Sequence, residues 1–213
     1  MGGKSKGMER VVNRQAVDLI ADVRNCRRCR VPPESYPIVS EYCGQRFFLL
    51  GQAPGKEELR QNRKFAGPAG RTLFRWFAQA GMGDESAIRR HLFICAVAHC
   101  WPGTREGSSD DLPPSAEMRG NCSGHVAALL ELVDPDWVLA VGGYAQQAIF
   151  GAKRPLRELV GVVHQVVWGV RERNVLVLPH PSGLSRWLND PVHRALHERG
   201  LGYLREAWQQ GPR

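Results

Sequence analysis

Two short, uninterrupted apolar segments constrain the fold of this chain more than any other feature. Residues 47–50 read Phe-Phe-Leu-Leu, and residues 175–178 read Val-Leu-Val-Leu. A strand with one face in water alternates apolar and polar residues, whereas a continuous apolar run is typical of a strand buried on both faces. Such strands belong to parallel sheets that helices cover on both sides. The sequence therefore predicts an α/β fold.

Both apolar segments run into short loops that glycine and proline stiffen. Residues 51–55 read Gly-Gln-Ala-Pro-Gly, and residues 179–183 read Pro-His-Pro-Ser-Gly. In open parallel sheets, ligands bind at the edge where the strands have their carboxyl ends. We therefore expect the two loops, with His180 in the second, to face a single site.

Helical and strand-like segments alternate along the rest of the chain. Strands are expected at residues 92–97 and 137–141 and in a hairpin of 162–168 with 175–178, and helices at residues 12–23, 68–80, 115–133, 144–150 and 191–208. This alternation predicts a three-layer αβα sandwich with a central four-stranded parallel sheet. We expect a single domain over residues 9–213, preceded by a flexible basic tail at residues 1–8.

The charge of the chain indicates what it binds. It has 29 lysine and arginine residues against 21 aspartate and glutamate residues, a formal charge of +8. This surplus favours a polyanionic partner; the alternative is a basic protein without one. No segment has the length and apolar character of a membrane-spanning helix, and the first residues lack the apolar region of a secretory signal. We therefore expect a cytoplasmic protein that does not contact a membrane.

The six cysteines are expected in a reducing compartment, where metal or cluster binding is commoner than disulfide formation. Cys26 and Cys29 form a C-x-x-C pair, and Cys100 and Cys122 follow much later. Four thiolates that the fold brings together suit either zinc or an iron–sulfur cluster. The alternative is a set of core cysteines with one accidental pair. Cys95 lies in an apolar segment and is expected to be a small buried hydrophobic residue.

In their order along the chain, these segments resemble the iron–sulfur uracil-DNA glycosylases of families four and five. The resemblance spans residues 26–188 and rests on the C-x-x-C pair, residues 51–55, Lys-Phe-Ala-Gly at 64–67, Cys100, Cys122 and His-Pro-Ser at 180–182. It implies a [4Fe–4S] cluster on Cys26, Cys29, Cys100 and Cys122. It also implies a DNA repair enzyme that turns uracil out of DNA and hydrolyses its N-glycosidic bond, leaving an abasic site.

The resemblance assigns roles to two ring-bearing residues. Phe65 matches the aromatic residue that stacks on the base, and the alternative is core packing under a loop. His180 matches the histidine that donates a hydrogen bond to the uracil carbonyl as negative charge builds there. The alternative for His180 is a histidine that only caps the end of a strand.

The loop at residues 51–55 departs from many relatives because it contains no carboxylate. Gln52 and the backbone amides around Ala53, which follow Gly51, match the part of the loop that frames the sugar and the pyrimidine. Glu58 aligns with a glutamate of family four, and the alternative is a solvated helix start. Ala96 stands where family four has an asparagine that reads the uracil edge. This leaves open a separate branch with a broader range of deaminated bases.

The segment after His180 resembles the loop that relatives push into the duplex. Leu184, beside a glycine, suits a wedge that fills the space left by the flipped base. Ser182, Ser185 and Arg186 are candidates to hold the flanking phosphates. The alternative is a turn with one buried leucine.

The sequence thus predicts a monofunctional uracil-DNA glycosylase that acts as a monomer on uracil-containing DNA. A second class of function is a non-catalytic iron–sulfur protein that binds uracil or abasic DNA. A third is a zinc-stabilised α/β hydrolase acting on nucleotides. Release of free uracil separates the first two, and a brown colour separates a cluster protein from a zinc protein.

Overall fold

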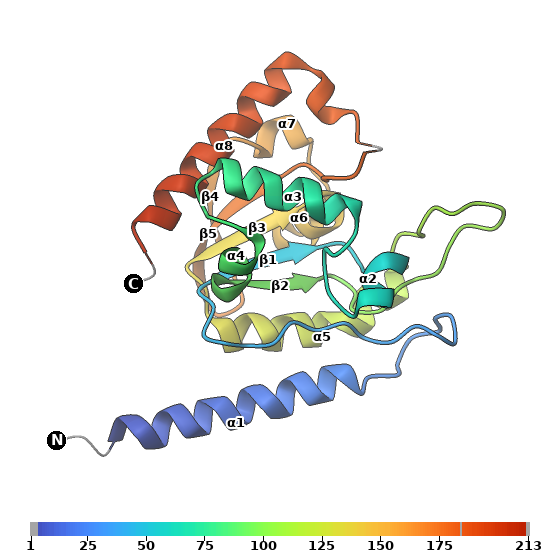
Figure 1. Ribbon diagram of the computed structural model, residues 1–213, viewed down its shortest axis with the longest axis vertical. Helices are drawn as coiled ribbons and strands as arrows, with labels where there is room; N and C mark the ends of the chain where they lie inside the picture. The colour runs from blue at the N-terminus through green and yellow to red at the C-terminus, as the bar shows by residue number, and fades with distance from the viewer. Residues whose placement is uncertain (1–3, 184, 212–213) are drawn as a thin grey trace.

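The computed structural model describes residues 4–183 and 185–211, and for residues 4–13 it describes the backbone alone. Its centre is a five-stranded sheet in the order β2-β1-β3-β5-β4 (Figure 1). The strands are β1 (Phe47–Gly51), β2 (Leu92–Ala96), β3 (Trp137–Val141), β4 (Val163–Trp168) and β5 (Arg171–Leu178). All five residues of β1 and of β2 are buried, as their continuous apolar sequences predict.

The sheet has one strand more than expected. β1, β2, β3 and β5 are mutually parallel, which confirms the four predicted parallel strands. β4, the first arm of the expected hairpin, pairs with β5 in antiparallel fashion and becomes the fifth strand. No residue of β4 is buried, and its side chains are either half-buried or exposed. This strand therefore covers the edge of β5 and faces solvent itself.

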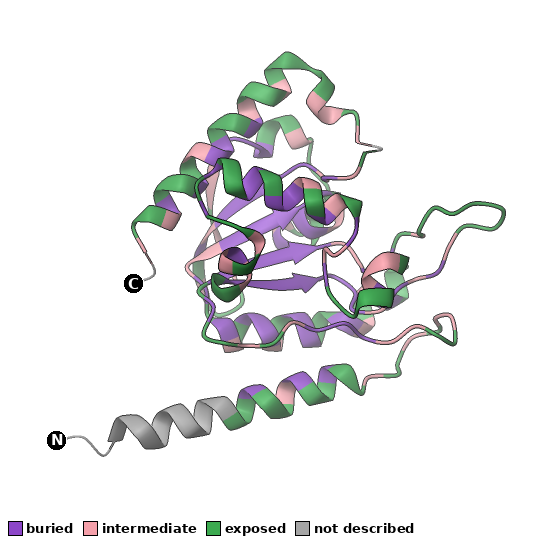
Figure 2. Cartoon of the chain, in the orientation of Figure 1, coloured by how far each residue is buried: buried purple, intermediate pink, exposed green. Residues whose placement is uncertain are grey.

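Helices cover both faces of the sheet, so the predicted three-layer αβα sandwich is confirmed. One face carries α1 (Lys4–Arg24), α5 (Ala116–Val133) and α6 (Gly143–Phe150), and the other carries α3 (Pro68–Gln79), α4 (Glu85–His91) and α8 (Pro191–Gln209). The side chains of a strand alternate between the layers: Phe48 packs in the α5 layer and Leu49 in the α3 layer. Figure 2 shows the strands buried between helices whose outer surfaces are exposed.

Several short elements were not among the expected helices, although a helix start at Glu58 was one alternative. They are α2 (Lys56–Gln61), α4, α7 (Leu156–Leu159) and the 3₁₀ helix η1 (Trp187–Asn189). Local capping explains two of them. The Glu58 carboxylate accepts a hydrogen bond from the Gly55 backbone N–H at 3.1 Å at the start of α2, and the Asp84 carboxylate accepts one from the Ala87 N–H at 2.7 Å in α4. A side chain that satisfies an unpaired N–H of the first turn stabilises a helix too short for a clear apolar period.

The boundary expected after residue 8 is not visible in the backbone, because α1 begins at Lys4 and runs through it. Residues 1–3 lie outside the described part of the chain. Within the described residues, no helix combines the length and the apolar character needed to cross a bilayer.

His197 of α8 makes the stability of the sandwich sensitive to acid. Its ring packs edge-on against Trp76 of α3, with ring centroids 4.4 Å apart. The residue is 6% exposed, and burial lowers its pKa from 6.5 to about 4. Between these pKa values the unfolded chain binds a proton that the folded chain does not, so the free energy of unfolding falls as the pH falls.

We expect this group alone to cost about 2 kcal/mol of stability between about pH 7 and about pH 5. The variant His197→Phe keeps an aromatic ring against Trp76 and removes the titrating group. Urea unfolding at the two pH values measures the effect, and the variant should lose about 2 kcal/mol less than wild type. An equal loss in both proteins would contradict this assignment.

Candidate active site and cysteine-lined cavity

The carboxyl ends of the parallel strands open into a cavity of about 500 Å³. It is lined by residues 51–55 at the end of β1, by residues 95–96 at the end of β2, and by His180, Ser182 and Gly183 after β5. The expectation that the two stiff loops face one site is therefore confirmed. In Figure 1 the arrowheads of β1 and β2 point toward α2 and the long loop at residues 101–114, which lie at this edge. The cavity lining includes Gly51, Gln52, Ala53, Glu58, Phe65, Ala96, His180 and Ser182, eight of the residues expected at the site.

Phe65 lies across the end of β1 in a strained backbone conformation. Its φ is +53°, in the left-handed region that bulky residues seldom adopt. Two glycines leave room for it: a Cβ on Gly51 would lie 3.1 Å from the Phe65 ring, and a Cβ on Gly70 would lie 1.8 Å from the Phe65 carbonyl oxygen. Strain of this kind persists where the surroundings hold it in place. The close packing therefore fixes a ring as part of the cavity wall.

His180 is held in one orientation and one tautomer. The Ser182 backbone N–H donates a hydrogen bond to Nδ1 at 3.3 Å, which places the proton of the neutral ring on Nε2. Gly142, with φ +82°, allows the ring to approach closely, since a Cβ there would lie 3.0 Å from Cδ2. Burial lowers the pKa of His180, so the ring is neutral at physiological pH. The site therefore contains a neutral imidazole with an Nε2–H donor.

A carboxylate from a distant loop reaches the rim of the cavity. Asp111 accepts a hydrogen bond from Trp101 Nε1 at 2.6 Å and contacts the Lys56 backbone N–H at 3.2 and 3.3 Å. A Cβ on Gly55 would lie 2.4 Å from Asp111 Oδ2, so the glycine makes room for this carboxylate. Sequence reasoning missed Asp111, because nothing in a polar loop indicates which of its residues folds back onto β1.

Glu58 lies beside the same loop. Its carboxylate is bound to the Gly55 N–H and lines the cavity. Burial raises the pKa of Glu58, and the nearby charge of Asp111 also raises it. Glu58 lies in the first turn of α2, as one alternative predicted, and it also faces the cavity, while its role there stays a prediction. Two carboxylates therefore flank the loop that itself has none.

Lys64 is a second residue that sequence reasoning missed. It is 5% exposed and lines the cavity next to Phe65. Its Nζ lies 3.4 Å from His99 Nδ1, and its carbonyl oxygen accepts a hydrogen bond from Arg89 at 2.9 Å. A lysine in a polar segment is normally exposed, so the sequence offered no signal for its burial.

The expected DNA-contacting residues are only partly gathered at the cavity. Ser182 lines it, whereas Ser185 and the exposed Arg186 follow outside the lining. The Ser185 backbone N–H donates to the Ser182 carbonyl oxygen at 3.0 Å, which closes a turn. Leu184, the expected wedge, lies outside the described residues. The roles of these residues stay predictions.

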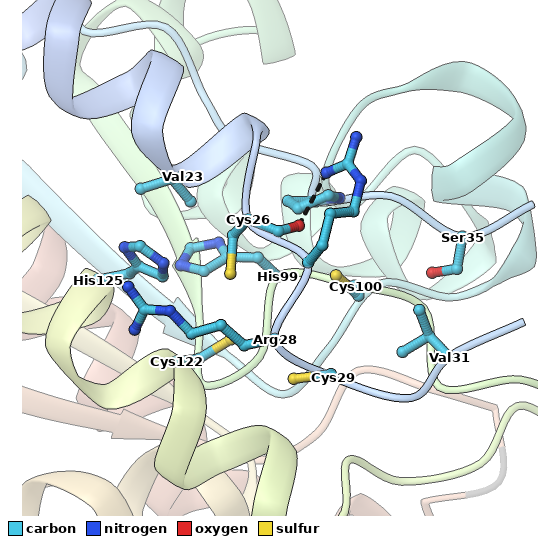
Figure 3. Close-up of a pocket in the computed structure, with 12 residues that line it drawn as sticks. Val23, Cys26, Arg28, Cys29, Val31, Ser35, His99, Cys100, Cys122 and His125 are labelled. Carbon is cyan, nitrogen blue, oxygen red and sulfur yellow. Dashed lines mark hydrogen bonds between the residues drawn. The ribbon is translucent and has the colours of Figure 1, made fainter. Parts of the chain in front are cut away.

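The four cysteines implied as ligands line a second, smaller cavity of about 50 Å³. Cys26 and Cys29 come from the segment after α1, Cys100 from the segment after β2, and Cys122 from α5. Figure 3 shows their sulfur atoms around one space, with the rings of His99 and His125 beside it. The other two cysteines differ, because Cys43 is exposed and Cys95 is buried in β2, as expected for Cys95.

The chemistry of this cavity fits a sulfur-rich group. Nε2 of His99 and Nε2 of His125 are buried without a hydrogen-bond partner in the described part of the chain. Burial and the neighbouring thiols raise the pKa of Cys100 to about 12. Without a bound metal Cys100 is therefore a protonated thiol, and metal binding would release its proton. Imidazole N–H groups can donate to the sulfurs of an iron–sulfur cluster.

The spacing of the donors bears on which group fits. Among the described residues, no three His, Cys, Asp or Glu side chains lie close enough to share a single metal ion. A zinc ion gathers four ligands at about 2.3 Å from one centre. In a [4Fe–4S] cluster each thiolate binds its own iron, so the sulfur atoms are spread over a larger group.

Comparisons with known proteins agree with this geometry. The family model described as the uracil DNA glycosylase superfamily matches residues 39–210. A type-4 uracil-DNA glycosylase of Archaeoglobus fulgidus is 25% identical over 174 residues, which cover 78% of this chain and 81% of the relative. The type-4 enzyme of Thermotoga maritima is 27% identical over 154 residues, which cover 72% and 73%.

A solved structure shares the fold. The crystal structure of SMUG2 from Pedobacter heparinus superposes with a TM-score of 0.56 at 11% identity, and covers 93% of this chain and 97% of that chain. At this identity the match shows the fold alone.

Proposed function

The chain belongs to the uracil-DNA glycosylase superfamily, and we propose that it removes uracil from DNA by hydrolysing the N-glycosidic bond. The observation that carries this proposal is the convergence of Phe65, His180 and residues 51–55 on one cavity of about 500 Å³. A base inside a duplex is out of reach of such a cavity, so the nucleotide must first leave the stack, at a cost of a few kcal/mol. The product is an abasic site in DNA.

Phe65 holds the flipped base by stacking. Its ring is fixed at the end of β1 by the close approach of two glycines, so little conformational entropy is lost when a base packs on it. Aromatic stacking of a base contributes about 1–3 kcal/mol. Gln52 and the backbone amides around Ala53 line the cavity beside Phe65 and frame the sugar and the pyrimidine.

His180 stabilises the departing base. As the bond between the sugar C1′ and uracil N1 breaks, its electron pair goes to uracil and negative charge develops on the carbonyl oxygens. The Nε2–H of the neutral ring donates to one of these oxygens, while Ser182 holds Nδ1 in place. A donor that is positioned before the reaction pays no reorganisation cost as the charge appears.

Water completes the reaction on the sugar. We assign a largely dissociative path, in which positive charge develops on the sugar before a water oxygen bonds to C1′ and its proton passes to solvent or uracil. The carboxylates of Glu58 and Asp111 beside the loop at residues 51–55 favour this positive charge. Gln52 can orient the water but cannot remove its proton, since its amide does not ionise.

The cysteine-lined cavity is proposed to hold a [4Fe–4S] cluster on Cys26, Cys29, Cys100 and Cys122. The cluster would serve as a structural tie, because its ligands would come from the segment after α1, the segment after β2 and α5. The unpartnered Nε2 atoms of His99 and His125 support this proposal, since cluster sulfurs would accept their hydrogen bonds.

Uracil-containing DNA is the proposed partner, bound by a monomer in the cytoplasm. The formal charge of +8 favours binding to phosphates. Ser182, Ser185 and Arg186 follow His180 directly, so a duplex whose base occupies the cavity would pass close to them.

The test is an excision assay on end-labelled DNA that contains one uracil, followed by alkali, which cleaves at abasic sites. We expect free uracil and alkali-dependent strand breaks, and no breaks without alkali. Binding of the DNA without release of uracil would instead support a non-catalytic protein that captures uracil. DNA with thymine in place of the uracil is the control substrate.

A further inference from the structure

Lys64 is a buried donor in the wall of the large cavity that the proposed mechanism does not use. It is 5% exposed and lines the cavity together with Cys95 and Ala96 at the carboxyl end of β2. Its Nζ lies 3.4 Å from Nδ1 of His99, which comes three residues after the end of β2. The Lys64 amine therefore lies near the carboxyl end of this strand.

The hydrogen-bonding capacity of this amine is largely unused. In the described part of the chain its side-chain partner is His99 Nδ1 at 3.4 Å, and no carboxylate oxygen lies within ion-pair distance of it. A lysine amine has three donors when charged and accepts nothing in that form. Burying a donor without enough acceptors is costly. A ligand that brings a carbonyl oxygen into the cavity would supply the missing acceptor.

The chemistry of deaminated bases provides that acceptor. Cytosine carries an amino group at C4 and adenine carries one at C6, and both are donors that would oppose the lysine amine. Deamination replaces the amino group with a carbonyl oxygen, O4 in uracil and O6 in hypoxanthine. The side chain of Ala96 cannot hydrogen-bond to either group, so recognition of this edge needs another residue.

We propose that Lys64 Nζ donates a hydrogen bond to the carbonyl oxygen that deamination creates, and so distinguishes uracil from cytosine. This inference rests on the proposed glycosylase function and adds a specificity-determining residue to it. Lys64 takes the place of a polar side chain at position 96. The same amine can donate to O6 of hypoxanthine, whereas the C6 amino group of adenine is itself a donor and would oppose it.

The experiment removes the donor and the acceptor separately. Lys64→Met keeps an unbranched side chain and loses the amine. 2-Pyrimidinone in DNA lacks the O4 of uracil, and its N3 carries no hydrogen. Under single turnover, we expect Lys64→Met to excise uracil about 10²-fold more slowly than wild type. Excision of 2-pyrimidinone should change by no more than about threefold, because the contact is already absent. Each variant rate is divided by the wild-type rate on the same base, so the different lability of the two glycosidic bonds does not affect the comparison.

Lys153→Met is the matched control. Lys153 is exposed in the segment after α6, and its substitution removes the same charged group as Lys64→Met does. It should excise both bases at wild-type rates. Equal slowing of Lys64→Met on uracil and 2-pyrimidinone would overturn the proposal, because a merely structural lysine affects both. Capture of Lys64 on abasic DNA by borohydride would also overturn it, since the amine would then reach the sugar.

A second measurement uses the unmodified protein and so does not depend on the folding of a variant. Free uracil should inhibit excision at least about tenfold more strongly than free 2-pyrimidinone, and equal inhibition would overturn the proposal. The two hypotheses fail differently. Wild type that releases no uracil contradicts the glycosylase function itself, whereas active wild type with rates independent of Lys64 contradicts only the role of Lys64.

Discussion

Replacing His180 with alanine is expected to slow uracil excision by about 10²–10³-fold, or about 3–4 kcal/mol in the barrier. The neutral ring is held by the Ser182 N–H on Nδ1, and its Nε2–H is the donor that we propose for the charge of the departing uracil. Alanine removes this donor and leaves the residues that stack on the base. Binding to DNA that already contains an abasic site should therefore change little, and single-turnover excision measures the loss.

His164→Ala is the matched control, because His164 lies in the edge strand β4, outside the lining of the cavity, and bonds to the Leu159 carbonyl oxygen at 2.9 Å. It should excise uracil at close to the wild-type rate. The His180→Gln variant keeps a side-chain N–H donor and should recover part of the loss. Near-wild-type excision by His180→Ala would contradict the assignment, and so would a wild-type rate that declines as the pH rises above neutrality, since the ring acts in its neutral form.

Replacing Cys122 with alanine is expected to remove the proposed cluster and more than about 4 kcal/mol of stability. Cys122 is a buried residue of α5, and the other three proposed ligands belong to segments before and after β1. Losing the group that ties these segments together should leave a protein without brown colour that unfolds at lower urea concentration. Visible absorbance, iron and sulfide analysis and urea unfolding measure the effect.

Cys43→Ala is the control for this prediction, because Cys43 is an exposed cysteine outside the small cavity. It should keep the colour, the iron content and the stability of wild type. A colourless wild-type protein that contains one zinc ion per chain would contradict the cluster and support the zinc-stabilised alternative. A Cys122→Ala protein with full iron content would show that the cluster has other ligands.

Part of the site could be predicted because its signals are local in sequence. A strand buried on both faces needs a continuous apolar run, and residues 47–50 and 175–178 met this need without reference to the rest of the chain. The carboxyl ends of parallel strands meet at one edge, so residues 51–55 and His180 had to lie near each other once both strands were recognised. Phe65 and the four cysteines came from the family resemblance, and the cavities contain them.

Other parts of the site depend on contacts between distant segments. Asp111 reaches the loop after β1 because Trp101 and the Lys56 N–H hold its carboxylate, and neither contact has a sequence signal. Lys64 is buried next to the strained Phe65, with His99 Nδ1 as its side-chain partner, although a lysine in a polar segment is normally exposed. The sequence predicted residues 162–168 as one arm of a hairpin, but whether this arm joins the main sheet as a fifth strand depends on its pairing with β5.

The layers of the fold and the edge of the sheet where the large cavity lies follow from burial periodicity and strand direction, which are local properties of the sequence. Which polar side chains enter this cavity depends instead on contacts between distant segments. That choice depends on the free energy of burying a charged or hydrogen-bonding group, which changes sign according to the partners that a distant segment brings to it.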